Sequence, residues 1–237
     1  IGEGWARSEV ALLYRSNAQS RVIEHALFSA GIAYRVYGGL RFFERAEIKH
    51  ALAYLRLLEN SDDDGALLRV VNFPARGIGA RTLEALQDAA RAGQCSLFAA
   101  VASLGGAAAG KLAVFRQLIE RLRADTQALP LTDVVEHLID RSGLIAHYQA
   151  EREGQDRIEN LRELVNAAAG FLAEEGVARD APANVGVADA VDPADPVAAS
   201  PDVDLPGAPG AARITPLAAF LGHASLEAGE NQAGEGS

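Results

Sequence analysis

The length of 237 residues suits one large domain or two small ones, and an apolar fraction of 49% is ordinary for a chain with a buried core. A single cysteine, Cys95, excludes an internal disulfide framework, and no uncharged apolar run of about 18 residues predicts a membrane span. The net charge of −10 excludes a uniformly basic protein, yet nine acids and two bases fall within 176–237. The other 23 acids and 20 bases are nearly balanced, which permits a local basic patch.

The first part of the chain predicts a β-α-β unit. Residues 9–15 have the pattern of a buried strand, 18–30 that of a helix, and 32–37 that of a second strand. Their spacing is that of a parallel crossover. Two strands do not make a stable sheet, and the chain starts at Ile1 without any methionine. We therefore expect a piece of a longer protein whose remaining strands lie elsewhere.

Helical periodicity dominates the rest of the chain, so the predicted fold class is mainly α. The predicted helices cover 44–59, 62–71, 80–92, 96–103, 107–127, 131–141, 143–152, 156–174 and 216–228. Residues 176–213 are rich in Ala, Val, Pro, Asp and Gly and lack aromatic residues, which predicts a disordered acidic insertion. Residues 229–237 form a polar tail.

The main candidate site is the turn at 76–82, with the sequence Arg-Gly-Ile-Gly-Ala-Arg-Thr. Its two glycines let backbone amides approach an anion, and the N-terminus of the following helix favours negative charge. Ile78 is expected to pack inward, while Arg76 and Arg81 add positive charge. This chemistry predicts contact with nucleic-acid phosphates. The alternative is an ordinary glycine turn between two helices.

Two other segments invite a binding role. Gly105–Lys111 satisfies G-x-x-x-x-G-K, but Leu112 replaces the hydroxyl residue that holds magnesium and no strand leads into it. We interpret it as a linker and the solvated start of a helix. The polar residues Tyr14, Arg15 and Asn17 follow the first predicted strand, where α/β sheets bind ligands. The alternative there is an N-cap with a surface salt bridge.

No metal site is predicted, because none of the five histidines stands in an H-x-x-x-H arrangement. The acidic run Asp62–Asp64 indicates a helix N-terminus rather than a cation site. Phe42 and Phe43 are expected in the core. A solvated face is predicted for Glu44, Arg45, Glu47 and Lys49.

Several spaced motifs together resemble the UvrD/Rep/PcrA helicases of superfamily 1. They lie at 10–21, 34–45, 47–57, 70–79, 157–161 and 217–229. In that family a helical subdomain 2B is inserted in a RecA-like subdomain 2A. The resemblance implies that 1–39 is part of 2A and that 40–228 is 2B, with a hinge at Gly38 and Gly39.

The resemblance also implies site residues. The glycine turn of 2B grips duplex DNA ahead of the fork, and a surface of 2A touches the single strand. The implied duplex-binding residues are Arg76, Gly77, Ile78, Gly79, Arg81, Thr82 and Lys49. The implied single-strand-binding residues are Tyr14, Arg15 and Asn17.

The implied function is that of the duplex-binding and regulatory portion of an ATP-dependent 3′-5′ DNA helicase of DNA repair. ATP and Mg²⁺ are the cofactors expected for the longer protein, whereas this chain lacks the ATPase motifs and is expected to be inactive alone. Expected partners are DNA and, in an alternative role as an interaction module, repair proteins or RNA polymerase. Unpaired strand edges allow self-association. The expected location is cytoplasmic, without a membrane partner.

Overall fold

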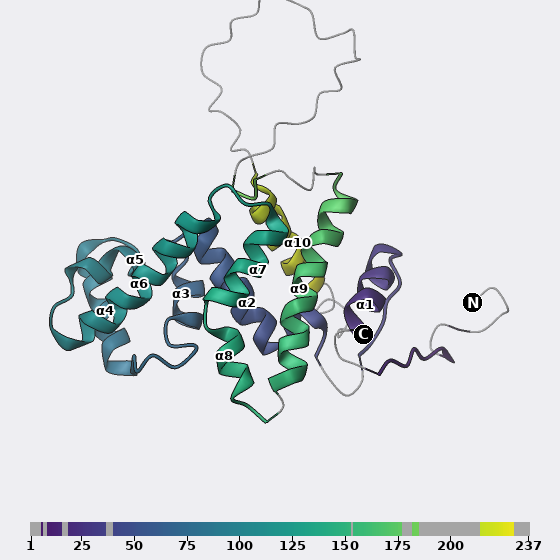
Figure 1. The fold of residues 1–237 in the computed structure, drawn as a ribbon, viewed down its shortest axis with the longest axis horizontal. Helices are drawn as coiled ribbons and strands as arrows, with labels where there is room; N and C mark the ends of the chain where they lie inside the picture. The colour runs from purple at the N-terminus through teal and green to yellow at the C-terminus, as the bar shows by residue number, and fades with distance from the viewer. Residues whose placement is uncertain are drawn as a thin grey trace, which may run out of the picture.

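The computed structural model describes residues 6, 9–15, 19–36, 40–152, 154–176, 182–184 and 214–229. Its helices are arranged around a central α2, with α4 and α5 at one end of the molecule and α1 at the other (Figure 1). In chain order the helices are α1 (Ser20–Ser29), η3 (Phe42–Glu44), α2 (Ala46–Glu59), α3 (Asp64–Val70), α4 (Ala80–Gly93), α5 (Leu97–Ala100), η4 (Val101–Ser103), α6 (Gly106–Thr126), α7 (Leu131–Arg141), α8 (Leu144–Gln149), α9 (Gly154–Glu174) and α10 (Pro216–Gly229).

The mainly α prediction is confirmed, and most helix bounds agree within two residues. Helix α7 occupies the predicted range 131–141 and begins after Pro130, which suits the first turn of a helix. The acidic run caps α3 as expected, since the carboxylate of Asp63 accepts a hydrogen bond from the Ala66 amide at 2.8 Å. Local periodicity and capping therefore define the helical part.

The two predicted strands are not formed in the part of the chain that the structure describes. Residues 9–15 and 32–36 pair with no neighbouring strand, and the single β-bridge between described residues joins Pro130 to Pro182. A strand needs a partner for its backbone groups, and no described segment supplies one here. Without one, Leu13 is 95% exposed.

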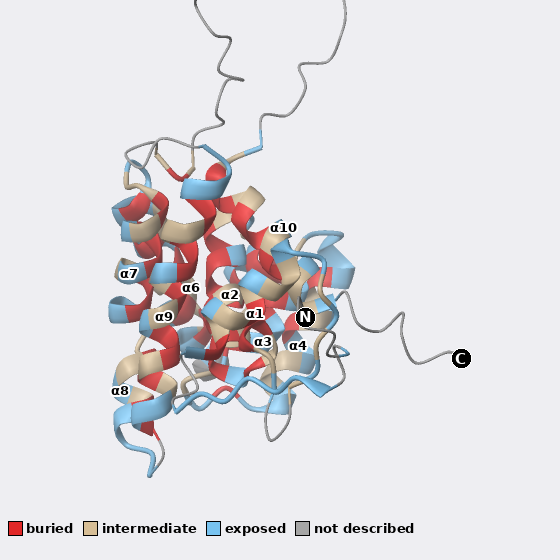
Figure 2. Cartoon of the chain, turned by 90° about the vertical axis from the view of Figure 1, so that its right-hand side faces the viewer, coloured by how far each residue is buried: buried red, intermediate tan, exposed pale blue. Residues whose placement is uncertain are grey.

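The core lies where α2 faces its neighbours. Helix α2 contacts α3, α6, α7, α9 and α10, and buried positions line the facing sides of these helices (Figure 2). Phe42 and Phe43, predicted as core residues, are buried, with ring centroids 5.0 Å apart and nearly perpendicular rings. Burial of α2 on several sides makes it the scaffold to which the loops attach.

The guanidinium of Arg45, just before α2, joins three distant segments. One terminal nitrogen donates to Asn160 Oδ1 at 3.0 Å, the other donates to Ser20 Oγ at 2.6 Å, and Nε donates to the Leu40 carbonyl at 3.3 Å. Asn160 in turn donates to Glu47 Oε1 at 2.7 Å. This network connects α1, α2 and α9.

The network corrects the prediction of a solvated face. Arg45 and Glu47 are only 7% and 5% exposed. Their shared partner, Asn160, stands 115 and 113 positions away in the sequence. Because the amide that satisfies both side chains comes from another helix, the local charge pattern could not reveal these hydrogen bonds.

The half-buried His50 lies in the second turn of α2 and contacts two aromatic residues. The ring of His50 stacks on Phe73, with centroids 3.7 Å apart, and its Nδ1 lies 3.2 Å from the Tyr148 hydroxyl. Burial raises the pKa of Tyr148 to about 12, so its hydroxyl stays protonated and can donate to a neutral imidazole. Burial, followed by the charge of Arg69, lowers the pKa of His50 to about 4.

Among the described residues, no helix is both long and apolar enough to cross a bilayer.

The first prediction concerns Arg45. Its replacement by alanine leaves buried acceptors on Asn160, Ser20 and Leu40 without a donor, so Arg45→Ala should lower the free energy of unfolding by about 3–5 kcal/mol. Urea denaturation measures this loss. Arg91→Ala is the control, because its exposed pair with Asp88 should contribute about 0–1 kcal/mol. Equal losses for the two variants would contradict a buried role for Arg45.

The second prediction is a pH dependence from His50. The unfolded chain takes up a proton at His50 near pH 6.5, whereas the folded chain resists protonation until about pH 4. The contribution of His50 to stability is therefore complete above pH 6.5 and declines as the pH falls toward 4. Urea midpoints between pH 7.5 and 4.5 should fall less steeply for His50→Gln than for the unsubstituted chain. Parallel pH profiles would show that this imidazole is not protected.

Candidate nucleic-acid interface

The loop between α3 and α4 includes the start of the turn predicted at 76–82, and residues 72–79 are called the glycine turn from here on. One side chain closes this loop. Asn72 Oδ1 accepts hydrogen bonds from the amides of Arg76 at 2.9 Å and Ile78 at 3.0 Å. Ile78 is buried as predicted, at 2% exposure. The asparagine thus folds the backbone back on itself, while the isoleucine anchors it to the core.

Arg76 points into the protein rather than toward solvent. Its terminal nitrogens donate to the carbonyls of Val70 at 3.0 Å, Pro74 at 3.1 Å and Ser142 at 3.3 Å, and to the Tyr54 hydroxyl at 2.6 Å. These contacts favour a positioning role for Arg76, and its predicted contact with a phosphate stays a prediction. The sequence could not reveal this, because the arginine's acceptors are mainly backbone carbonyls.

Two aromatic rings, Tyr54 and Phe115, also contact the Arg76 guanidinium. The Arg76 carbon Cζ lies 5.2 Å from the Phe115 ring centroid, close enough for a cation–π contact. Burial raises the pKa of Tyr54, although Arg76 opposes the shift, so the hydroxyl remains protonated. Tyr54 can then donate to the Phe73 carbonyl at 2.6 Å while accepting from Arg76. The turn is held to α2 by this pair.

Gly77 and Gly79 differ in whether the structure requires a glycine at their position. Gly77 has φ +69°, a left-handed conformation that favours glycine, and a Cβ there would meet Lys111 Nζ at 2.7 Å. Gly79 has φ −92° and open space where a Cβ would lie. Neither backbone conformation nor internal packing requires glycine at 79. Its missing side chain leaves the start of α4 open from outside.

Among the described residues, no carboxylate caps the N-terminus of α4. Gly79 is its N-cap and supplies no side chain to bond the first amides, and the first turn contains no acidic residue. Arg81 is exposed, and within the described part of the chain its guanidinium has no hydrogen bond or ion pair. The half-buried Thr82 donates its amide to the Gly79 carbonyl at 3.0 Å. The site therefore combines a positive helix end with an available cation.

A second cation at this turn was missed by sequence reasoning. Lys111, in the first turns of α6, donates its Nζ to the Gly77 carbonyl at 2.9 Å and is otherwise exposed. The sequence predicted it only as the solvated start of a helix, within the false G-x-x-x-x-G-K match. No local signal connects residues 34 positions apart, so only the packing of α6 beside the turn reveals this contact.

The other predicted residues lie apart from the glycine turn or outside the described residues. Lys49 is half-buried in α2, and no hydrogen bond or ion pair between described residues joins it to the turn. Tyr14 and Arg15 are exposed in the extended segment before α1, where the Arg15 amide donates to Gln19 Oε1 at 3.1 Å. Asn17, Gly38, Gly39, most of 176–213 and all of 230–237 lie outside the described residues.

Relatives of this chain are known helicases. A family model described as the UvrD-like helicase C-terminal domain matches residues 3–236. DNA helicase II of Escherichia coli K12 is 44% identical over 238 residues, and DNA helicase II of Haemophilus influenzae is 44% identical over 241 residues. These matches cover 97% and 98% of this chain but 28% of each relative. ATP-dependent DNA helicase PcrA of Bacillus subtilis is 41% identical over 171 residues, or 69% of this chain and 23% of that protein.

The matches therefore span between 23% and 28% of the length of these relatives. The resemblance seen in the spaced motifs is confirmed by the match over nearly all of its residues. The chain belongs to the UvrD-like helicase C-terminal domain family.

Proposed function

We propose that this chain is the duplex-binding and regulatory part of an ATP-dependent 3′-5′ DNA helicase of DNA repair, and that its glycine turn holds duplex phosphates. The observation that carries this proposal is the open N-terminus of α4, which has exposed glycines, no acidic residue in its first turn and a cation on either side. Helix N-termini bind phosphate through their free amides and their positive dipole.

The two cations suit a backbone contact rather than base recognition. Lys111 uses one of its three donors on the Gly77 carbonyl, which fixes the ammonium beside the turn and leaves its other donors for a phosphate. Arg81 extends from the first turn of α4 without an internal partner among the described residues. Contacts of this kind hold the duplex in position without reading its sequence.

The proposed domain assignment rests on the family resemblance of the spaced motifs and is supported by exposed apolar residues near the start. We assign 1–39 to a partial RecA-like 2A subdomain and 40–228 to a helical 2B subdomain. The exposure of Val10, Leu12 and Leu13 supports this assignment, because strand-type apolar residues of a RecA-like sheet need neighbouring strands to cover them. Those strands would belong to the rest of a protein as long as the relatives.

ATP and Mg²⁺, proposed cofactors of the longer protein, do not fit the one phosphate-loop-like segment here. Gly105 caps α6, and the preceding residues form η4 rather than a strand. Leu112 is fully buried where a magnesium-binding hydroxyl would stand. No chemical step is assigned to this segment, and DNA binding is the activity proposed for the chain itself.

The third prediction tests the proposed contact directly. Binding of the 237-residue chain to a labelled duplex with a 3′ single-stranded tail is measured by fluorescence anisotropy across a salt series. Arg81→Ala and Lys111→Ala should each weaken binding and reduce the slope of log K against log salt by about one, because each removes one phosphate contact. The double variant should lose about two.

Arg91→Ala is the matched control, because it removes the same charge from the last turn of the same helix. It should leave the salt slope unchanged. Unaltered binding by the Arg81→Ala/Lys111→Ala variant, or no binding by the unsubstituted chain at low salt, would contradict the proposal.

The fourth prediction separates Arg76 from those contacts. Arg76→Gln breaks hydrogen bonds that hold the turn, so it should lower the urea midpoint and weaken DNA binding. The salt slope should change much less than for Arg81→Ala, because Arg76 positions the turn without touching a phosphate. A slope reduced by about one in a stably folded Arg76→Gln variant would restore Arg76 as a direct contact.

A further inference from the structure

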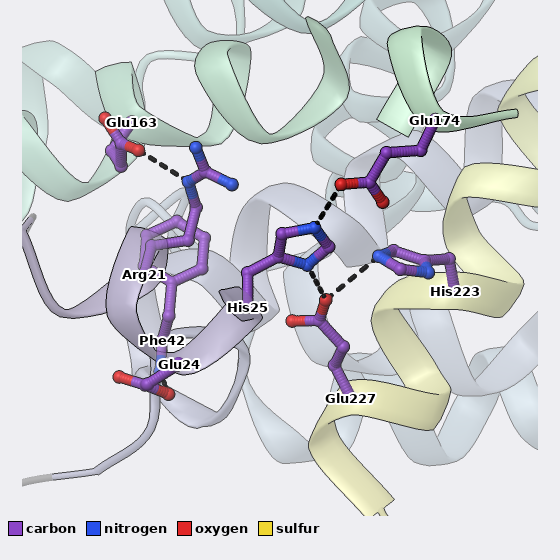
Figure 3. A network of polar contacts seen from close by, with 8 residues as sticks. All are labelled: Arg21, Glu24, His25, Phe42, Glu163, Glu174, His223 and Glu227. Carbon is purple, nitrogen blue, oxygen red and sulfur yellow. Dashed lines mark hydrogen bonds and ion pairs between the residues drawn. The ribbon is translucent and has the colours of Figure 1, made fainter. Parts of the chain in front are cut away.

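Two histidines and two glutamates from three helices distant in the chain, α1, α9 and α10, converge at one place (Figure 3). His25 Nδ1 lies 2.7 Å from Glu227 Oε1, and His223 Nε2 lies 2.9 Å from the same oxygen. His25 Nε2 lies 2.6 Å from Glu174 Oε1. One carboxylate oxygen of Glu227 is thus shared by two imidazoles.

We propose that His25, His223 and Glu227 form a binding site for a zinc ion. Their three donor atoms all lie within 4.8 Å of one another. Donors around tetrahedral zinc lie about 2.0–2.1 Å from the metal and so about 3.3 Å apart. Glu227 Oε1 must therefore withdraw by roughly half an ångström from each imidazole, and the two imidazole donors, which lie within 4.8 Å of each other, must adjust to that spacing. Small side-chain rotations achieve this.

The secondary structure supplies the ligands in a suitable arrangement. His223 and Glu227 are four residues apart on α10, which places them on the same face of that helix. His25 arrives from α1 on the other side of the ion. Phe28 makes an edge contact and Phe171 a tilted contact with the His223 ring, with centroids 6.2 and 5.3 Å away. These contacts restrict the His223 ring before any ion binds.

Glu174 has the place of a supporting carboxylate. When Nδ1 of His25 coordinates a metal, Nε2 carries the remaining proton and can donate it to Glu174 Oε1. Such a carboxylate fixes the tautomer and orientation of the ligand and raises its basicity. The side chain of Glu174 is 51% exposed, so the cluster opens toward solvent on that side. A water molecule can complete the coordination.

The donor set favours zinc over harder cations. Two imidazoles and one carboxylate match the borderline character of Zn²⁺, whereas Ca²⁺ and Mg²⁺ prefer oxygen ligands alone. In the absence of metal, protons take its place. Burial opposes the charge on His25, but the hydrogen bonds to Glu174 and Glu227 prevail and raise its pKa. Zinc binding at Nδ1 of His25 then displaces a proton from that ring.

The proposed zinc site differs from the sequence-based prediction that the chain has no metal site. That expectation rested on the absence of two histidines at four-residue spacing, whereas this site pairs a histidine with a glutamate at that spacing on α10. Its third ligand stands 202 positions before Glu227. A bound ion would cross-link α1 to α10 and stabilise their contact. This inference is independent of the proposed DNA binding.

Isothermal titration of the chelator-treated 237-residue chain with Zn²⁺ at pH 7.5 tests the site. We expect one ion per chain, and a rise in Tm at saturation. Co²⁺ used as a spectroscopic probe should give the absorption bands of a four-coordinate N/O site. His25→Gln and Glu227→Gln should each weaken Zn²⁺ binding by more than 100-fold, and Glu174→Gln by about 10- to 100-fold.

Two matched controls locate the ion. His137→Gln alters another histidine near a carboxylate, 3.5 Å from Asp125, and should leave the affinity unchanged. Cys95→Ser removes the exposed thiol and should also have no effect. Circular dichroism verifies that each variant is folded, and His223→Gln replaces any ligand variant that is not. Stoichiometric binding that survives two ligand substitutions, or no binding below millimolar Zn²⁺, would overturn the proposal.

Discussion

The buried guanidinium of Arg45 is the interaction on which the arrangement of α1, α2 and α9 depends. A guanidinium offers five donors in a planar fork, so a single side chain can satisfy acceptors on several segments at once. Here it binds Asn160, Ser20 and the Leu40 carbonyl, and Asn160 passes the connection on to Glu47. Removing water from such a charge is costly unless every donor has a partner, which selects one relative placement of the three helices.

Arg76 applies the same principle near the middle of α2. Its guanidinium binds backbone carbonyls at the end of α3, in the glycine turn and at the end of α7, while Tyr54 supplies a hydroxyl from α2. The hydrogen bonds of Arg76 on the inner side of the turn therefore fix the position of the start of α4. Arg76 thus shapes the turn, whereas Arg81 and Lys111 remain accessible beside it. A phosphate site needs both, because accessible amides bind weakly when the loop that presents them must first be ordered.

The sequence predicts those features whose cause is local. Helix α7 follows from apolar periodicity after Pro130, and α3 follows from the carboxylate of Asp63 at its N-cap. Features with distant causes were wrong or missed. Arg45 resembled a surface charge, and Lys111 resembled part of a nucleotide motif, because their partners are not neighbours in sequence. The strand at 9–15 was wrong for a related reason: its apolar run indicates which residues a sheet would bury, but the pairing strand must come from elsewhere.

The position of α1 bears on how the proposed subdomains could move. The predicted boundary at 39 places α1 with the RecA-like part, yet its contacts are with the helical body. Arg21 pairs with Glu163 of α9, Ser20 accepts from Arg45, and His25 bridges Glu174 and Glu227 (Figure 3). A rotation about a hinge at Gly38 and Gly39 would have to break all three connections together. In this conformation the contacts therefore tie α1 to the body that a hinge would swing, and any reorientation must include the cost of exposing the Arg45 guanidinium.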